Sequence, residues 1–222
     1  MKRQAAEAAL AHVQDGCRLG LGSGSTAEIF VELLAQRVGD GLSVRCCATS
    51  ERTARLAGGL GISVFDLDHF SMLDLCVDGA DEIDPQLNLI KGGGACHLRE
   101  KVVASYAGSL LIIADESKLV QQLGAFRVPV ELVPFSLPLV QREVQCMEDC
   151  RSFELRLQDG RPLLTDEGNL IADADFGVIT DPGSLAQRLG AIPGLVEHGL
   201  FVGMARLAII GSQAGVRTLQ RA

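Results

Sequence analysis

The sequence predicts an α/β protein: a Rossmann-like domain with a mostly parallel sheet, and a second, smaller α+β domain of ferredoxin-like type. Three observations predict this fold. Short apolar runs alternate with segments of helical period over residues 2–114, which indicates a parallel sheet covered on both faces. A glycine-rich turn at residues 20–26 follows the first apolar run. After Gly124 the pattern changes, and prolines occur at positions 129, 134, 138 and 162.

The first domain is predicted to alternate helices and strands. The Ala-rich stretch 2–14 is typical of a helix, and so is the segment 27–38, whose apolar residues recur every three or four positions. Thr49 or Ser50 can cap a third helix, and a fourth is expected over residues 95–107. The predicted strands are 17–21, 42–48, 62–65, 73–77 and 109–114, with a long loop at 78–94.

The second domain is predicted to mix short strands with two helices. The expected elements are strands 128–133 and 152–157, a hairpin over 162–173, and helices 137–148 and 181–189. Asp181-Pro182 supplies a cap and a first-turn proline for the last of these helices. A final strand at 207–210 is expected to rejoin the first domain. We therefore expect one domain of residues 1–124 plus 200–222, and a small domain of residues 125–199.

Charge and composition exclude several classes of partner. The 222-residue chain has a net charge of −8 and only four lysines. Nucleic-acid binding is not expected, because phosphate neutralisation by basic groups dominates that affinity. An anionic membrane surface is an equally poor partner. A small anion remains possible, since one local pocket can be positive on an acidic protein.

Cysteine usage and hydropathy predict a cytoplasmic protein. The seven cysteines form no C-x-x-C pair and no recognisable zinc spacing, so we interpret them as reduced thiols and expect no metal site. No apolar run reaches the roughly 18 residues of a membrane span. The first sixteen residues alternate polar and small side chains and lack the apolar stretch of a secretory signal.

The first motif is the turn Gly20-Leu-Gly-Ser-Gly-Ser-Thr26 between a strand and a helix. Its glycines allow close backbone approach, and the helix N-terminus and hydroxyls suit a phosphate. The dinucleotide-binding pattern fails because its sixth position is Ser25, and the Walker phosphate-binding loop of nucleoside triphosphatases fails because no Gly-Lys pair occurs. The motif therefore favours a terminal phosphate on a small molecule over an ordinary capped turn.

The second motif, Val77-Asp-Gly-Ala-Asp-Glu-Ile-Asp84, stands at the carboxyl end of a strand, where open α/β sheets bind ligands. Its four acids repel one another unless a cation, sugar hydroxyls or solvent relieve them. The spacing does not fit a calcium loop. Magnesium, a hydroxyl network and a solvated acidic turn all remain open.

Two further motifs place lysines near the same sheet edge. In Lys91-Gly-Gly-Gly94, three glycines let N–H groups converge on an anion beside a positive charge. Glu100 follows in the next helix; a lone helical glutamate is usually a surface ion-pair partner, but these neighbours make it a candidate base. Ala114-Asp-Glu-Ser-Lys118 follows another strand, as a helix cap with a lysine.

Together these motifs resemble ribose-5-phosphate isomerase of the A type. The matching segments are GSGST (22–26), DGADEID (78–84), KGGGA (91–95) with REK (99–101), and ADESK (114–118). Further matches are Thr49-Ser50, GAFRVPVELV (124–133), TDEGNLIAD (165–173) and GLF (199–201). The resemblance covers nearly the whole chain, and the ordered set is specific where any single motif is weak. Ser23 and Cys96-His97-Leu98 are mild departures from the family.

The resemblance implies interconversion of D-ribose 5-phosphate and D-ribulose 5-phosphate, with neither a metal nor an organic cofactor. It implies Glu100 as the catalytic glutamate, and Lys2 or Arg3 as a further phosphate contact. The implied substrate-binding residues are Ser23, Gly24, Ser25, Thr26, Asp78, Gly79, Ala80, Asp81, Lys91, Gly92, Gly93, Gly94 and Lys118. The small domain would partly cover the site and join two subunits, so we expect a homodimer.

The chemistry fits these residue types. One carboxylate, Glu100, can remove a proton at one carbon and return it at the next. Lys91 and glycine N–H groups would stabilise the enediol(ate) oxygen, while Asp78 and Asp81 would bind hydroxyls and assist ring opening. A non-catalytic sugar-phosphate sensor is the main alternative, although we see no room or basic patch for a DNA-binding module. A metal-dependent sugar-phosphate phosphatase is a third.

Overall fold

The computed structural model describes residues 1–221, which form two compact units. The first unit contains Met1–Ala80, Arg99–Leu119 and the C-terminal segment from Gly203; the second contains Asp81–Leu98 and Val120–Val202. The expected domain division differs chiefly at 81–98. This segment joins the second unit because its strands β4 (Glu82–Ile83) and β5 (Leu89–Ile90) form a small sheet with β13 (Leu200–Phe201).

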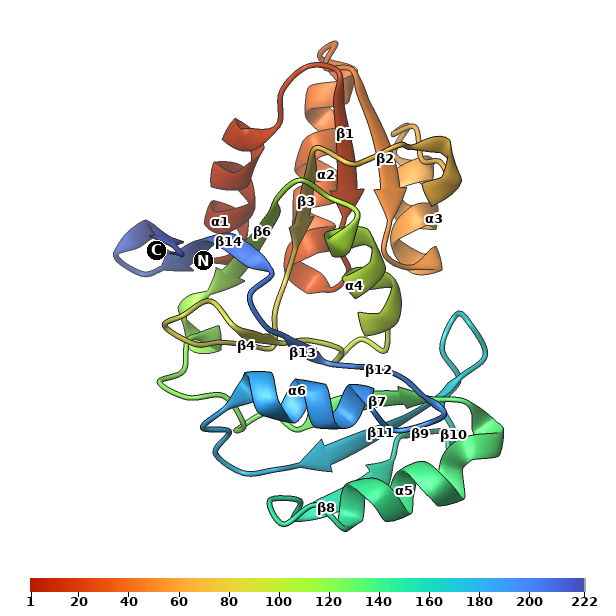
Figure 1. Cartoon of the computed structure of the whole chain (residues 1–222). Helices are drawn as coiled ribbons and strands as arrows, with labels where there is room; N and C mark the ends of the chain where they lie inside the picture. Colours follow the sequence, from red (N-terminus) through yellow and green to blue (C-terminus); the bar gives the residue numbers. More distant parts are fainter. Residues whose placement is uncertain (222) are drawn as a thin grey trace. The chain divides into compact units, whose positions relative to one another are not determined.

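The first unit is built on a six-stranded sheet in the order β15-β14-β6-β3-β1-β2 (Figure 1). Every neighbouring pair is parallel except the edge pair β14–β15, so the predicted Rossmann-like, mostly parallel sheet is confirmed. The strands are β1 (Cys17–Leu21), β2 (Val44–Ala48), β3 (Leu75–Asp78), β6 (Leu110–Asp115), β14 (Ala205–Ser212) and β15 (Gly215–Gln220).

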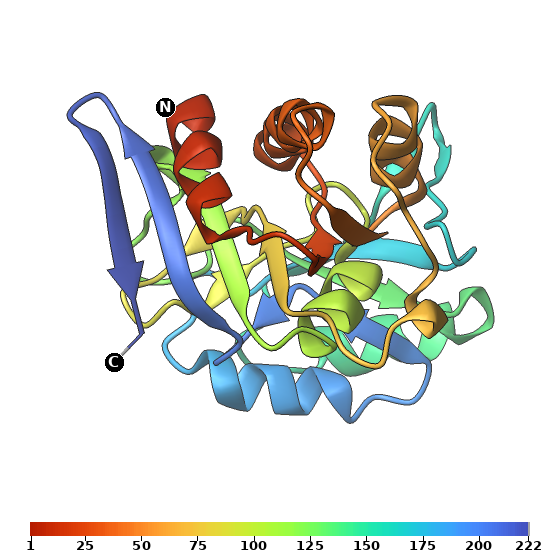
Figure 2. The same cartoon turned by 90° about the horizontal axis from the view of Figure 1, so that it is seen from above.

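Helices cover this sheet as its apolar pattern requires. Helices α1 and α2 lie side by side over one face (Figure 2). Leu19 and Leu21 of β1 pack in the core between the sheet and these helices. The intervening Gly20 faces the other side of the sheet, because successive strand residues point to opposite faces. There Val103 of α4 leaves no room for a side chain at position 20. The helices are α1 (Lys2–Ala9), α2 (Ser25–Gly39), α3 (Glu51–Gly59) and α4 (His97–Ser105), with a 3₁₀ turn at Leu10–His12.

The second unit contains a four-stranded antiparallel sheet in the order β12-β7-β11-β8. Two helices interrupt the strands in the chain order βαββαβ, which is the ferredoxin-like arrangement that the sequence predicts. Apolar residues of one sheet face, among them Val130, Ala172 and Phe153, pack in the core with Val140 and Leu185 of the two helices. The elements are β7 (Val128–Leu132), α5 (Leu137–Gln145), β8 (Ser152–Leu155), β11 (Leu170–Asp175), α6 (Pro182–Gly190) and β12 (Leu195–His198).

The opposite face of this sheet carries several carboxylates. Glu131 of β7 is fully buried there and accepts hydrogen bonds from Thr165 Oγ1 and Asn169 Nδ2, both at 2.9 Å. Burial raises the pKa of this carboxyl, although both hydrogen bonds oppose the shift. Asp173 of β11 lies in register with Glu154 of β8 on the same face. The carboxylates of this face can hold a neighbouring loop by hydrogen bonds, as Glu131 holds the segment of Thr165 and Asn169.

Several predicted elements differ from the structure. Residues 62–65 form only one bridge, Val64 with Cys46, so the predicted strand is not formed. The hairpin expected over 162–173 is reduced to one bridge, Leu164 with Leu170, before β11. A separate hairpin pairs β9 (Leu157–Gln158) with β10 (Arg161–Pro162). Within residues 1–221, no helix combines the length and apolar character needed to cross a membrane.

Gly124 should be the least replaceable glycine of the second unit. A Cβ on Gly124 would lie 1.7 Å from the Gly177 carbonyl oxygen, and its φ is +118°. Gly160 also has a positive φ, +76°, but a Cβ there meets no heavy atom within 4 Å. We expect Gly124→Ala to lower the free energy of unfolding by about 3 kcal/mol or more, and Gly160→Ala by about 1 kcal/mol. Urea unfolding measures both, and equal losses would contradict the steric account.

Candidate active site

Asp78 fixes the turn that follows β1. Its Oδ1 accepts hydrogen bonds from the backbone N–H of Ser23 at 3.0 Å and of Gly79 at 2.7 Å. The Gly22 N–H donates to the Val77 carbonyl at 2.9 Å, so the ends of β1 and β3 are joined. A Cβ on Gly22 would lie 2.1 Å from Asp78 Oδ1. The buried carboxylate therefore occupies space that only a glycine at position 22 leaves open.

A hydroxyl cluster holds Ser23 from the other side. Ser23 Oγ lies 2.8 Å from Thr49 Oγ1, 2.8 Å from Ser50 Oγ and 3.1 Å from Thr53 Oγ1. Ser50 also caps α3 by accepting a hydrogen bond from the Thr53 N–H at 3.1 Å. The prediction that Thr49 or Ser50 caps this helix is thus resolved in favour of Ser50. The side chain of Ser23 is consequently used in fixing the turn.

The start of α2 has a lysine beside it. Gly24 precedes this 15-residue helix with a φ of +97°, and the first N–H groups of a helix favour anions. Lys2 Nζ donates to Ser25 Oγ at 2.8 Å, whereas Arg3 pairs with Glu7 at 2.9 Å. The structure therefore places Lys2, of the two candidates, at this turn.

Lys118 lies in the same electrostatic environment as Lys2. It ends the 3₁₀ turn Glu116–Lys118 after β6, and Asp115 caps that turn by accepting the Ser117 N–H at 3.0 Å. Burial pushes the Asp115 pKa upward, but the hydrogen bonds from Ser117 and the charges of Lys2 and Lys118 leave it below its ordinary value. Both lysines therefore contribute positive potential around Asp115.

Glu100 lies in the first turn of α4 and is 5% exposed. A lone glutamate on a helix is usually solvated, so this burial separates Glu100 from an ordinary surface residue. A buried carboxylate exchanges hydration for protein contacts.

In the second unit, Asp81 holds the triple-glycine loop. Its Oδ2 accepts the Gly93 N–H at 2.8 Å, and its own N–H donates to the Ile90 carbonyl at 2.8 Å. A Cβ on Gly93 would lie 2.8 Å from Asp81 Oδ1, and one on Gly92, whose φ is +107°, would lie 2.8 Å from His97 Nδ1. The loop 91–94 thus needs glycine both for conformation and for space.

Lys91 begins this loop and is 2% exposed. Its N–H donates to the Gly199 carbonyl at 2.8 Å, which ties the loop to the segment before β13. Its ammonium lies 5.5 Å from the centre of the Phe201 ring, within the range of a cation–π interaction. The side chain is therefore a cation held away from bulk water.

The carboxylates of the acidic motif accept hydrogen bonds from backbone amides. Beside Asp78 and Asp81, Glu82 accepts N–H bonds from Gly124 at 2.7 Å and Phe126 at 2.6 Å. Asp84 accepts N–H bonds from the next turn at 2.9 and 2.7 Å. Among residues 1–221, no three His, Cys, Asp or Glu side chains gather as a metal site would require. Sequence reasoning weighed cations, hydroxyls and solvent, and missed this anchoring of the chain.

Known proteins match the whole chain. Residues 45–215 match the family model of ribose 5-phosphate isomerase A (phosphoriboisomerase A). The chain belongs to the ribose 5-phosphate isomerase A family. It is 51% identical to ribose-5-phosphate isomerase A of Agrobacterium fabrum, over 99% of this chain and 97% of that protein. The corresponding protein of Rhizobium etli is 52% identical, with the same shares covered. The chain is therefore an isomerase, as the motif set predicts.

Solved structures of the family share the fold. Ribose 5-phosphate isomerase A from Methanocaldococcus jannaschii superposes with a TM-score of 0.93 at 38% identity, covering 99% of this chain and 97% of that one. A D-ribose-5-phosphate isomerase in complex with phospho-erythronic acid gives 0.95 at 37% identity, with the same coverage. Both likenesses extend over the two units, so the predicted fold class is that of the family.

Sequence reasoning missed one contact to the glycine loop. Arg156, between β8 and β9, donates from Nη1 to the carbonyls of Gly92 at 2.9 Å and Gly93 at 3.3 Å. The one available signal was that Arg156 alternates with Leu155 and Leu157 in the predicted strand 152–157. This alternation places Arg156 on the same strand face as Glu154.

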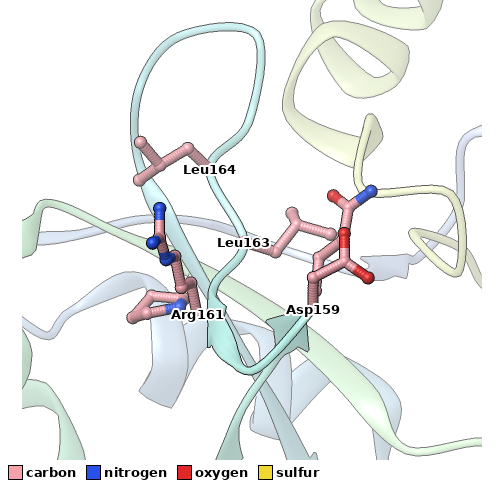
Figure 3. A pocket seen from close by; sticks show the side chains of 6 residues that line it. Asp159, Arg161, Leu163 and Leu164 are labelled. Carbon is pink, nitrogen blue, oxygen red and sulfur yellow. The ribbon is translucent and has the colours of Figure 1, made fainter.

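A hollow of about 580 Å³ beside the β9–β10 hairpin is separate from the candidate site residues. It is lined by six residues of that hairpin alone, four of which Figure 3 labels. It contains none of the predicted site residues.

Gly22 provides a direct test of the Asp78 turn. Because a Cβ at position 22 would collide with the Asp78 carboxylate, we expect Gly22→Ala to displace that carboxylate and to reduce kcat/KM by about 10²-fold. Gly39, at the end of α2, has nothing within 4 Å of a built Cβ, so Gly39→Ala should remain within about twofold of wild type. Steady-state kinetics on ribose 5-phosphate measures both, and wild-type kinetics for Gly22→Ala would contradict the packing argument.

Proposed function

We propose that this chain interconverts D-ribose 5-phosphate and D-ribulose 5-phosphate by proton transfer between C2 and C1 through an enediol(ate), with Glu100 as the base. The observation that carries the proposal is the burial of Glu100 in a chain that matches ribose-5-phosphate isomerase A over nearly its full length. A carboxylate suits the reaction because it can accept the proton from one carbon and return it to the next.

The phosphate is assigned to the turn before α2. Ser23, Gly24, Ser25 and Thr26 offer hydroxyls and N–H groups at the start of a long helix. Ser23 chiefly shapes the turn, because its Oγ bonds to neighbouring hydroxyls and its backbone N–H donates to Asp78. Lys2, through Ser25, and Lys118 add the positive charge that holds a phosphate dianion. Remote binding of this kind orients the reacting end of the sugar.

The remaining groups act on the sugar and on the developing charge. Asp78 and Asp81, with Gly79 and Ala80, are assigned to hydroxyl binding and to opening of the ring. Lys91 and the N–H groups of residues 92–94 are assigned to the oxygen that becomes negative when the proton leaves. A solved isomerase in complex with phospho-erythronic acid supports an enediolate intermediate, because the carboxylate of this acid resembles an enediolate in charge and planarity.

Two expectations about the setting remain proposals. The chain acts as a homodimer, as the family resemblance implies. It works in the cytoplasm, which the absence of disulfides among its seven cysteines supports. Several of these thiols are buried, and burial raises the pKa of Cys46 to about 12, so that thiol stays protonated and unreactive at neutral pH.

One assay separates isomerisation from the other functions considered. The protein is mixed with ribose 5-phosphate, and ketose, free phosphate and bound ligand are all measured. Ketose formation supports the proposal. Free phosphate would indicate a phosphatase, and binding without conversion would indicate a sensor.

Glu100→Gln should abolish isomerisation while leaving substrate binding intact. The amide keeps the shape of the side chain but cannot accept the proton, so we expect kcat to fall by about 10³-fold. Ketose formation measures the rate, and calorimetric titration with ribose 5-phosphate measures binding. Glu143→Gln is the matched control, because Glu143 is a surface residue of α5 that pairs with Arg142. A Glu100→Gln enzyme that retained more than a few per cent of the rate would remove Glu100 from the role of base.

Chelation should leave the rate unchanged. The acids of the motif 78–84 are bonded to backbone amides, and we assign the stabilisation of charge to Lys91 and N–H groups. The measurement is the rate of ketose formation before and after dialysis against EDTA. Loss of activity that Mg²⁺ restores would reassign the acidic motif to metal binding.

A further inference from the structure

Arg156 contacts the glycine loop with a side chain that is itself held in place. Its Nε donates to Asp173 Oδ2 at 2.9 Å, and its Nη2 donates to the other oxygen of the same carboxylate. The side chains of this pair are 16% and 23% exposed. A two-point guanidinium–carboxylate pair fixes the plane of the guanidinium. The third nitrogen, Nη1, is thereby aimed in one direction.

The backbone of Arg156 is equally fixed. Its N–H donates to the Ile171 carbonyl at 2.8 Å, and its carbonyl accepts the Leu163 N–H at 2.9 Å. Asp173 lies two residues further along β11. Asp173 therefore stands on the antiparallel sheet of the second unit, and Arg156, directly after β8, is hydrogen-bonded to the same strand β11. A sheet is a rigid element compared with a loop of glycines.

Nη1 reaches two successive carbonyls of the loop, those of Gly92 and Gly93. No peptide bond in residues 1–221 is cis, and in a planar trans peptide the C=O and the following N–H point in opposite directions. Holding the Gly92 carbonyl therefore turns the Gly93 N–H away from Arg156, and that N–H donates to Asp81 at 2.8 Å. Holding the Gly93 carbonyl likewise turns the Gly94 N–H away from Arg156.

Glycines cannot fix these peptide planes by themselves. Without a Cβ each residue has a wide choice of φ and ψ, so the orientation of the loop must come from its contacts. Arg156 supplies the contact on the carbonyl side, and Asp81 supplies one on the N–H side. A cation on the carbonyls also polarises the peptides and makes their N–H groups stronger donors.

We propose that Arg156, oriented by Asp173, is a positioning residue for the reaction: it sets the peptide planes of Gly92–Gly94 and, through the Gly93 N–H, the carboxylate of Asp81. This rests on the proposed function, in which that loop stabilises the enediolate oxygen. Arg156 acts through the loop and has no assigned contact with substrate.

The experiment compares Arg156→Lys with Arg127→Lys in the full-length enzyme. Arg127 lines the same hollow of about 420 Å³ as Arg156 and Asp173, but its ion pair is with the exposed Glu154, at 2.6 Å. Lysine keeps the charge at either position. At position 156, however, one ammonium cannot make the planar set of bonds to a carboxylate and two carbonyls.

Four quantities are measured: kcat and KM for ribose 5-phosphate, the inhibition constant of phospho-erythronic acid, and the amide hydrogen exchange of the peptide covering residues 91–95. For Arg156→Lys we expect kcat to fall at least tenfold with KM within threefold of wild type. The inhibition constant should rise at least tenfold, and exchange of the loop should accelerate. Arg127→Lys should leave all four near wild type.

Asp173→Asn provides a second route that keeps Arg156 itself. It should accelerate exchange of the loop and raise the inhibition constant, because the guanidinium loses its charged anchor. Unchanged exchange and unchanged kcat in Arg156→Lys overturn the proposal, and so does a loss that Arg127→Lys shares. If the wild-type enzyme formed no ketose, the proposed function would fail, whereas the exchange measurement would still decide whether Arg156 orders the loop.

Discussion

The hydrogen bonds from backbone N–H groups to the carboxylates of residues 78–84 are the interaction on which the candidate site depends. Asp78 holds the turn after β1 in the first unit. In the second unit Asp81 holds the glycine loop, and Glu82 holds the chain where it enters the ferredoxin-like domain. Ionised carboxylates form stronger hydrogen bonds than neutral acceptors do. Each of the four carboxylates in this motif, including Asp84, therefore binds a different stretch of backbone, although the sequence alone suggests mutual repulsion.

This anchoring explains why glycines occur where they do. Gly22 is required because the Asp78 carboxylate fills the place of a side chain, and Gly93 because the Asp81 carboxylate does the same. The glycines give the backbone access to the carboxylates, and the carboxylates return the order that the glycines lack. Neither half of this arrangement is stable alone, since a buried acid without its amide donors would carry an uncompensated charge.

The elements that could be predicted are those with a strong local signal. Strand β1, strand β7 and helix α6 begin and end within one residue of the expected limits, because an apolar run or an Asp-Pro cap marks them. The grouping of 81–98 could not be predicted, since β4 and β5 have two residues each. Their partner β13 lies more than a hundred residues away in the chain. A pairing at that distance leaves no periodic pattern to detect.

The candidate site shows the same contrast. The motif residues were proposed from composition and order. The contact between Arg156 and the loop depends instead on the register of β8 and β11, because that register brings Asp173 beside Arg156. The prediction of a strand at residues 62–65 was wrong for the opposite reason, because a strong local signal was present without the pairing. This stretch has the composition of a strand, yet only Val64 forms a bridge, so composition alone did not decide its pairing.

The scarcity of lysine gives Lys91 its significance. Removing an ammonium from water costs several kcal/mol unless protein contacts replace its hydration, and Lys91 is 2% exposed in a chain of net charge −8. A surface lysine would serve solubility without this cost, so burial needs another reason. A desolvated cation interacts more strongly with a charge that forms beside it than a hydrated one does. The ring of Phe201 offsets part of the cost without neutralising the charge. Burial of this side chain beside the Phe201 ring is the setting that the role proposed for Lys91 at the enediolate oxygen requires.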